Sequence, residues 1–559
     1  MRLSRIVVSN YKSIPADGVT LEFRANARFL VLVGKNNAGK SNLLEAISLI
    51  LGQTSVWRLS FLPSVYNDPS KPIVIEAELA DSTFGDGKGV GFSDPQCHAL
   101  MRAAKTKESY PGRILFHLTV PQSLEPEDEE AEQEPEKRTF QLLINQSEIR
   151  RKADEFRRRL VRYLAVPTLR SYSDLLSPSA WTPYGRLLRD LLAESGKTGE
   201  LVELIDQATQ RLREILKDEA ALLTHTAKAT AYVDEIGFNL TKDNDPAELL
   251  RNLSLSVTYG GRSEDIARVG TGTQSAVIIG VLELCLRHAA RAGVRLFSVE
   301  EPELFLHPQA QRYVSHLLRS IAADERSYVV LTTHSSAIVA NSDLLDVVRV
   351  ERDDQSQTRC IRLPANYDGL EQSERIIGTD TAEALFADMV VFVEGPSEAA
   401  VLPFVGRLTK TADGRGMCDF NRLNISVLDV GGKGEFTKYT ALFGALQISW
   451  RVIADRDALD DGSLKCFYER AGIEEQDDFE SRHKKLRSIG VAVLAEGEIE
   501  DYYPAKALAE LANCKPEELE GVIDQHREYS TGPEQADVVW TVIGENRKHI
   551  CDAEKAPFG

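Results

Sequence analysis

Apolar runs of strand length alternate with helical patterns over the first 120 residues. RIVVSN (5–10) and FLVLVG (29–34) are rich in β-branched and apolar side chains, which is typical of buried strands. SNLLEAISLIL (41–51) repeats its apolar positions with helical spacing and predicts a helix directly after the second strand. Two further runs, KPIVIEAEL (71–79) and RILFHLTV (113–120), predict more strands. The pattern therefore predicts an α/β fold.

A charged, helical pattern occupies residues 148–253, after an acidic segment at 124–138 that is typical of a solvated loop. LLRDLLAESG (187–196) and ELVELIDQATQRLREIL (200–216) carry apolar positions at three- and four-residue spacing. IRRKADEFRRRLVRYL (149–164) has helical character and carries seven basic residues. This arginine cluster either contacts DNA phosphates or forms a solvated or ion-paired helix face, and the second interpretation is favoured. Such an insert is typical of a helix pair or a dimer interface.

Alternation of strands and helices returns after Leu253 and continues to the C-terminal part of the chain. VRLFSVEE (294–301) and SYVVLTTHSS (327–336) predict two strands of the first unit. A second unit starts near Thr381 with four strand patterns: MVVFVEG, NISVLDVGG, SWRVIADRD and VAVLAEGEIE. Short apolar strands alternating with helices predict a parallel sheet covered on both faces.

Composition limits the class of protein. The chain has 559 residues, enough for about three to five structural units, and a formal net charge of −19. The acidic balance disfavours indiscriminate coating of nucleic acid, although it does not exclude a local basic groove. Seven dispersed cysteines without a Cys-x-x-Cys pair argue against a disulfide framework or a zinc ribbon. Since no apolar stretch approaches ~20 residues, we expect a soluble cytoplasmic protein.

The segment GKNNAGKS, from Gly34 to Ser41, matches the phosphate-binding pattern G-x-x-x-x-G-K-[ST]. It lies between a predicted strand and a predicted helix, which is the context that this motif requires. Backbone N–H groups of the loop, including those of Gly34, Asn37 and Gly39, would surround the phosphates. Lys40 would contact the β- and γ-phosphates, and the Ser41 hydroxyl would bind Mg²⁺. The motif predicts an ATP site.

Three later segments extend this site. The strand VRLFSVEE ends in two acids, of which Glu300 would hold magnesium and Glu301 would polarise the attacking water. His334 follows another strand, where its imidazole would sense the γ-phosphate. A turn of small residues at 270–274, which leads into a predicted helix, is suited to a second phosphate contact through Gly270, Gly272 and Gln274.

Carboxylates follow three strand patterns of the C-terminal unit. Glu394 stands at a strand end and Glu398 comes four residues later, while Asp455 and Asp457 are two residues apart and would point the same way on an extended segment. A last acidic group consists of Glu496, Glu498, Glu500 and Asp501. The carboxyl ends of parallel strands share one edge, so these groups would repel one another unless a cation such as Mg²⁺ or Mn²⁺ neutralises them.

The motifs NYKSI, GKNNAGKS, GTGTQS, EEPELFLHP and TTHS resemble the ABC-type ATPases of the RecF/SMC-like group. In particular they resemble the OLD (overcoming lysogenization defect) nucleases, whose cassette is split by a helical insertion. The resemblance implies that Glu300 replaces the usual Walker B aspartate. It also implies that Gly270, Gly272 and Gln274 of one subunit complete the nucleotide site of another.

The C-terminal unit resembles a Toprim domain, the metal-binding fold found in the same family. The resemblance implies that Glu394 is the first acid, that Glu398 is an additional metal ligand and that Asp455 and Asp457 form the DxD pair. It implies further residues at the site: the turn Gly431, Gly432 and Lys433, a later acid that is either Glu500 or Glu498, and a C-terminal lysine that is either Lys555 or Lys548.

These resemblances imply a domain order and a function. Residues 1–147 and 253–381 would form the ATPase domain, 148–252 a helical dimerisation insertion, and 382–559 the Toprim nuclease domain. The chain would be an ATP-binding, ATP-hydrolysing DNA endonuclease that uses two Mg²⁺ or Mn²⁺ ions, with ATP bound as its magnesium complex. The alternative is a RecF/SMC-like ATPase that clamps DNA and keeps a non-catalytic Toprim scaffold.

The expected assembly is a homo-oligomer, either a dimer or a dimer of dimers. The Gabija anti-phage nuclease subunit shares this architecture, which makes antiviral defence a candidate role. Whether a helicase-like partner is required stays open, and no membrane partner is expected. A topoisomerase or a primase is disfavoured because no DNA-gripping or template-binding domain is visible.

Overall fold

The computed structural model describes residues 2–24, 27–59, 61–82, 112–122, 139–144, 147–149, 153–167, 175–177, 182–215, 217, 250, 253, 255–259, 261–270, 272–274, 277–278, 280–281, 284, 294–304, 306–408, 418–474, 476–495, 497 and 499–502. The predicted acidic loop at 124–138 lies outside these residues. The chain divides into two compact units. The first consists of Met1–Leu30, Gly39–Thr333 and Arg352–Thr358, and the second of Val31–Ala38, His334–Glu351 and Arg359–Gly559.

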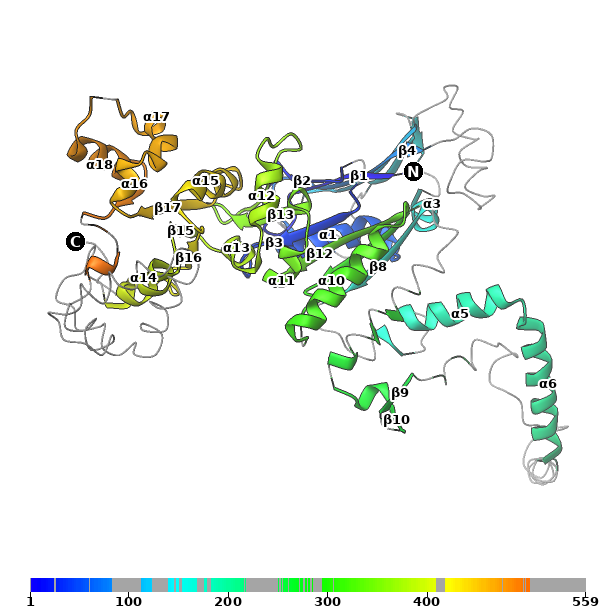
Figure 1. The fold of residues 1–559 in the computed structure, drawn as a ribbon. Coiled ribbons are helices and arrows are strands. Elements are labelled where there is room, and N and C mark those ends of the chain that lie inside the picture. The colour runs from blue at the N-terminus through cyan, green and yellow to red at the C-terminus, as the bar shows by residue number, and fades with distance from the viewer. Residues whose placement is uncertain are drawn as a thin grey trace. The chain divides into compact units, whose positions relative to one another are not determined.

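An antiparallel sheet of six strands begins the first unit (Figure 1). Its strands, in spatial order, are β2 (Val19–Glu22), β1 (Arg2–Ser9), β4 (Ile73–Ser82), β5 (Gly112–Val120), β6 (Thr139–Ile144) and β7 (Ser147–Ile149). Helix α1 (Lys40–Leu51) contacts β1, β4 and β5 and buries Leu43, Ile47 and Ile50. The strands predicted from the apolar runs before residue 120 are confirmed.

A second six-stranded sheet contains the strands that precede the predicted nucleotide-site residues. Its order is β14 (Thr358–Arg362), β13 (Val347–Arg352), β3 (Phe29–Val33), β12 (Ser327–Thr333), β11 (Val294–Glu300) and β8 (Val161–Val166). Strand β11 pairs in parallel with both β12 and β8, and β13 pairs in parallel with β3. Every residue of β3 and β12 is buried, which explains their continuous apolar runs. Helix α10 (Pro308–Ala322) packs on β12.

The helical pattern predicted across 149–164 is wrong at its C-terminal end. Helix α3 (Ala153–Leu160) ends at Leu160, and the next six residues form strand β8. The segment VRYLAV is rich in β-branched and aromatic side chains, and four of its six residues are buried against the sheet. Its backbone gains a full parallel partner in β11, which outweighs the local helical preference.

Three described helices lie within the predicted insertion at 148–252: α3, α5 (Pro183–Ser195) and α6 (Thr198–Ile215). Thr182 caps α5 by accepting a hydrogen bond from the Gly185 N–H at 3.1 Å, and Gly196 ends the helix with a φ of 69°. On α6, Leu204 and Ile215 remain exposed. A small hairpin of β9 (Ser256–Tyr259) and β10 (Arg262–Asp265) follows in the chain.

The second unit contains a four-stranded parallel sheet, as the sequence predicted (Figure 1). Its order is β16 (Ile425–Asp429), β15 (Met389–Val393), β17 (Ser449–Ala454) and β18 (Val491–Val493). The helices of this unit are α11 (Ser336–Ala340), α12 (Leu370–Ile376), α13 (Thr379–Ala384), α14 (Pro396–Leu408), α15 (Phe436–Ala445), α16 (Asp457–Asp460), α17 (Tyr468–Ala471) and α18 (Phe479–Ser488). Across the described part of the chain, no helix is both long and apolar enough to cross a bilayer.

The core of this sheet predicts a stability effect. Phe392 of β15 is fully buried, and its ring lies 5.7 Å from that of Tyr439 and 5.3 Å from that of Phe443, between ring centroids. We expect Phe392→Ala to lower the free energy of unfolding by about 3–5 kcal/mol, because it removes apolar contacts and leaves a cavity. Urea denaturation followed by circular dichroism would measure it. The control Leu423→Ala, at a partly exposed position, should leave the midpoint nearly unchanged; equal midpoints for both variants would contradict this core assignment.

Candidate nucleotide and metal sites

The phosphate-binding loop connects β3 to α1, and two of its glycines are required by geometry. Gly34 and Gly39 have φ angles of 148° and 108°, which side chains other than glycine rarely adopt. A Cβ atom on Gly34 would lie 2.0 Å from the Val350 carbonyl oxygen, and one on Gly39 would lie 2.1 Å from Thr358 Oγ1. The sequence assigned these glycines to phosphate binding, and the structure adds that neighbouring strands leave no room for a side chain.

Lys40 occupies the first position of α1 and is only 6% exposed. Burial lowers the pKa of Lys40 to about 8, while the charges of Glu301 and Glu303 oppose this shift. Lys40 begins helix α1, and backbone N–H groups and the helix dipole at a helix N-terminus favour an anion. A bound phosphate would add a negative charge beside this buried lysine.

Glu300 and Glu301 stand at the C-terminal end of β11. Glu300 is the last residue of the strand and is paired in register with Thr332. Glu301 has a φ of 43°, a left-handed conformation that is uncommon outside glycine, and its N–H donates to the Thr332 carbonyl at 2.9 Å. This turn directs the chain away from the sheet immediately after the two acids.

Glu303 belongs to the same site, although the sequence analysis did not select it. Its carboxylate is buried and accepts a hydrogen bond from Thr333 Oγ1 at 2.9 Å. The third acid of the EEPE segment was a visible signal for it. Ser41 is exposed on the first turn of α1, as expected for a hydroxyl that binds Mg²⁺.

His334 and the loop residue Lys35 both contact the segment that leads into β15. The His334 ring stacks on Phe386 with 6.1 Å between ring centroids. Lys35 forms an ion pair with Asp388, the residue immediately before β15. Two residues near the nucleotide site thus contact the entrance to the C-terminal sheet.

The small-residue turn is closed by its own hydrogen bonds. The Gln274 N–H donates to the Gly270 carbonyl at 3.1 Å, and Gln274 Nε2 donates to the carbonyls of Ile266 and Val269 at 3.0 and 3.2 Å. Residues 272–274 are helical, so the turn feeds a helix as predicted. The action of Gly270, Gly272 and Gln274 on another subunit stays a prediction.

At the C-terminal sheet, the ends of β15 and β17 are brought together. Glu394 follows β15, and its Oε1 accepts the Asp455 N–H at 3.0 Å from the end of β17. Burial raises the pKa of Glu394, and the negative charges of Asp457 and Asp461 raise it further. The hydrogen bond from the Asp455 N–H and the positive charge of Lys433 lower this pKa but do not cancel the rise. These two acids lie at one edge, as the sequence predicted.

Glu398 lies in the first turn of α14 and is 5% exposed. Its Oε2 accepts the Gly395 N–H at 3.2 Å, so the carboxylate closes the turn between β15 and α14. The sequence left Glu398 either in the turn after β15 or in the first helical turn, and the structure places it in the first turn of α14.

The expectation that Asp455 and Asp457 lie on an extended segment is wrong. The chain turns directly after β17: Arg456 has helical φ and ψ, the Ala458 N–H donates to the Asp455 carbonyl at 3.2 Å, and Asp457 begins α16. As a result, Asp455 contacts Glu394 through its backbone, whereas Asp457 forms an ion pair with Lys433.

Lys433 and Asp461 form a pair that motif spacing did not reveal. Lys433 Nζ lies 2.5 Å from an oxygen of Asp457 and 2.5 Å from one of Asp461. Its hydrogen bond lowers the pKa of Asp461 to about 2, and these two acids raise the pKa of Lys433 against the effect of desolvation. Asp429, at the end of β16, is a further acid that was missed; burial raises its pKa, and it accepts the Gly431 N–H at 2.7 Å.

The remaining predicted residues cannot be placed with these groups. Glu496, Glu498, Lys548 and Lys555 lie outside the described residues, and for Glu500 only the backbone is described, in the short helix Ile499–Tyr502. Within the described part, no group of three or more His, Cys, Asp or Glu side chains is arranged to hold a metal ion. The donor set nevertheless consists of carboxylate oxygens, which fit Mg²⁺ or Mn²⁺, and a cation there would compete with Lys433 for Asp457.

Family models match both parts of the chain. The model "AAA ATPase domain" matches residues 1–339, and the model "Overcoming lysogenization defect protein-like, TOPRIM domain" matches residues 385–457. The second match spans Glu394, Glu398, Asp455 and Asp457. The order predicted from the sequence, an ATPase domain followed by a Toprim domain, is confirmed.

The chain is similar in sequence to three named nucleases. The chain is 28% identical to the OLD nuclease of Thermus scotoductus over 81% of this chain and 82% of that protein. It is 23% identical to the Old nuclease of Escherichia phage P2, over 82% of this chain and 78% of that protein. It is 25% identical to endonuclease GajA of Bacillus cereus, over 44% of this chain and 41% of that protein.

The buried contact between Thr333 and Glu303 predicts a stability effect at the nucleotide site. Thr333→Val keeps the side-chain shape but leaves the buried carboxylate without this donor, so we expect stability to fall by about 1–3 kcal/mol. Thermal denaturation would measure the loss. Thr20→Val, at an exposed position of β2, serves as the control and should have little effect. A Thr333→Val protein as stable as wild type would show that the hydrogen bond does not support Glu303.

Proposed function

Since this chain belongs to the AAA ATPase domain family and is a nuclease of the OLD family, we propose that its C-terminal carboxylates hold the metal ions that cut DNA. The observation that carries this proposal is the contact between the Glu394 carboxylate and the Asp455 N–H, which joins two strand ends into one acidic edge. The ligands would be Glu394, Glu398, Asp455, Asp457 and either Glu500 or Glu498.

The cofactor would be two Mg²⁺ or Mn²⁺ ions, which supply an activated water and neutralise charge on the phosphate. The protein contributes the orientation of the ligands. The Asp455 N–H holds Glu394 in place, and the Gly395 N–H holds Glu398 at the start of α14. Lys433 keeps Asp457 near the edge, and it would turn towards the phosphate once a metal takes this carboxylate. Either Lys555 or Lys548 would complete the site.

The ATPase domain would control when this site cuts. Lys40 would hold the phosphates, Ser41 and Glu300 the magnesium, and Glu301 the attacking water. His334 would sense the γ-phosphate, and its stacking on Phe386, together with the ion pair between Lys35 and Asp388, supports a route from nucleotide to the C-terminal sheet.

The assembly and the biological role follow from the same reasoning. The turn at Gly270, Gly272 and Gln274 would complete the nucleotide site of a second subunit, which requires a dimer or a dimer of dimers. Similarity to endonuclease GajA supports a role in anti-phage defence, with or without a helicase-like partner. The alternative function, a DNA clamp whose Toprim domain is only a scaffold, is not favoured. A scaffold would not need metal-binding carboxylates, and this chain keeps Glu394, Asp455 and Asp457.

The two activities are expected to separate by mutation. Asp455→Asn should abolish cleavage of supercoiled and linear DNA in Mg²⁺ or Mn²⁺ while ATP hydrolysis persists, because the metal ligand lies on the C-terminal sheet. Lys40→Met should abolish ATP binding and leave the metal site chemically intact. Gel electrophoresis of the DNA measures cleavage, and phosphate release measures ATP hydrolysis. Asp460→Asn, an exposed acid on α16, is the control. Wild-type cleavage by Asp455→Asn would overturn the metal assignment.

The contact of Lys35 with Asp388 predicts a change in regulation. Asp388→Asn removes an exposed ion pair, so the ratio of cleavage with ATP to cleavage without ATP should shift by up to about fivefold. Cleavage without nucleotide should stay at the wild-type rate. Asp380→Asn, an exposed acid on α13, is the matched control. An unchanged ratio for Asp388→Asn would show that this ion pair does not transmit the nucleotide state.

A further inference from the structure

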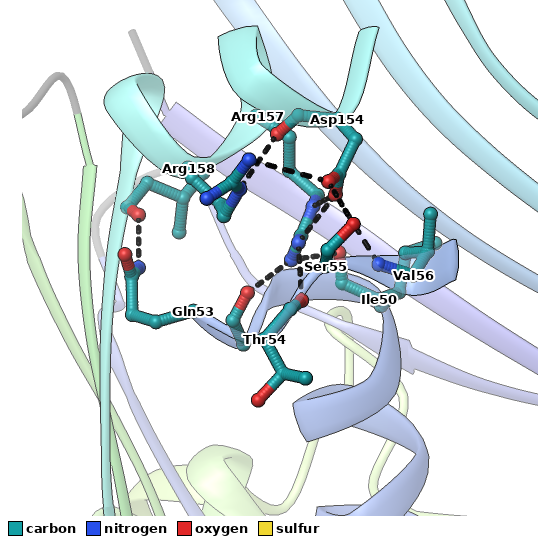
Figure 2. A network of polar contacts seen from close by, with 10 residues as sticks. Ile50, Gln53, Thr54, Ser55, Val56, Asp154, Arg157 and Arg158 are labelled. Carbon is teal, nitrogen blue, oxygen red and sulfur yellow. Dashed lines mark hydrogen bonds and ion pairs between the residues drawn. The ribbon is translucent and has the colours of Figure 1, made fainter. Parts of the chain in front are cut away.

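Arg157 of α3 is a fully buried charged side chain, with 0% exposure (Figure 2). Burying a guanidinium is costly unless hydrogen bonds and an opposite charge replace water. Asp154, one turn earlier on the same helix, supplies the charge, with 2.8 Å between its Oδ1 and Arg157 Nη2. The Asp154 carboxylate also accepts a hydrogen bond from Ser55 Oγ at 2.7 Å.

Arg157 also lies over the Phe140 ring of β6, with 5.8 Å from its Cζ to the ring centroid, and its remaining hydrogen bonds go to the C-terminal end of α1 and the residues just after it. Its guanidinium donates to the carbonyls of Ile50 at 3.0 Å and Thr54 at 2.9 Å, and also to that of Gly52. The last carbonyls of a helix lack partners within the helix, and a positive charge there interacts favourably with the helix dipole. The last turn of α1 contains no basic residue of its own. Arg157 therefore adds a positive charge and a hydrogen bond to Ile50 at this end of α1, beside the Gly52 N–H that caps the Ser48 carbonyl.

Strand β8, which follows α3 directly, makes a second connection. The buried Tyr163 hydroxyl hydrogen-bonds with Ser48 of α1 and Ser298 of β11, two residues before Glu300. Gln53 Nε2, just after α1, donates to the Val161 carbonyl at 2.9 Å. The α3–β8 segment thus contacts both the helix that begins with Lys40 and the strand that ends with Glu300.

We propose that Arg157 is a positioning residue for ATP binding and hydrolysis. Helix α1 has 12 residues and is about 18 Å long, and a helix of this length moves as a rigid rod. By holding its C-terminal end against α3, Arg157 sets the axial position of its N-terminal end, where Lys40 lies. The same contact ties the start of the helical insertion to the nucleotide site. This inference rests on ATP binding at residues 34–41 and not on DNA cleavage.

The test compares Arg157→Lys with Arg158→Lys in the full-length protein. Lysine keeps the charge at 157 but cannot reach three carbonyls and Asp154 together, so we expect KM for ATP to rise about tenfold, or about 1.4 kcal/mol, and kcat to fall. Arg158 is the matched control, because it is partly exposed and lies 3.5 Å from Asp154 in a looser ion pair. Its variant should retain both constants.

A thermal melt separates a positioning role from a purely structural one. A lower melting temperature with unchanged KM and kcat for Arg157→Lys would overturn the proposal. If Arg157→Lys does not fold, Ser55→Ala tests the same contact, because it removes a hydrogen bond to Asp154, the charge partner of Arg157. For Ser55→Ala we expect KM for ATP to rise by a smaller amount. An unchanged KM would overturn the proposal. ATPase constants are measured without DNA, so a failed cleavage assay bears on the nuclease proposal alone.

Discussion

Parallel strand pairing is the constraint on which both candidate sites depend. Strands that run parallel end along a common edge, where the sheet no longer uses the backbone N–H groups and where the following turns converge. β11 and β12 bring Glu300 beside Thr332 in this way, and β15 and β17 bring Glu394 to the Asp455 N–H. The apolar residues of these strands hold the strand ends in place: β11 and β12 are buried on both faces, whereas β17 buries alternate residues.

Each site contains a lysine whose charge is balanced inside the protein. Lys40 is buried and interacts with the charges of Glu301 and Glu303, and Lys433 forms ion pairs with Asp457 and Asp461. Under the proposed function, a phosphate at the first site or a divalent cation at the second would compete with these charged partners.

The nucleotide-binding helix is held at both of its ends. At its start, the loop glycines fit beneath Val350 and Thr358, and at its end Arg157 satisfies carbonyls that the helix cannot satisfy itself. A helix fixed in this manner has little freedom to shift along its axis. The link from Lys35 to Asp388 then adds a contact from the same loop to the C-terminal sheet.

Local pattern determined the strands, the phosphate-binding loop and the acids at strand ends. These features arise from periodicity and from short motifs, so the sequence predicted β3, α1, β11, β12 and the four strands of the C-terminal sheet. The order of ATPase and Toprim domains followed from the same motifs. For Glu398 the sequence left two positions, the turn after its strand or the first helical turn, and only the structure decided for the helix.

Tertiary contacts decided what the sequence could not. Residues 161–166 form a strand because β11 offers a parallel partner, although the preceding residues are helical. Asp455 and Asp457 separate because the chain turns at Arg456, and Asp461 joins the edge because Lys433 reaches it. The burial of Arg157 had no local signal, since the carbonyls that it contacts lie about a hundred positions earlier in the chain. Spacing along a sequence reports neighbours on one element, whereas the burial of a charge depends on elements that meet only in the folded chain.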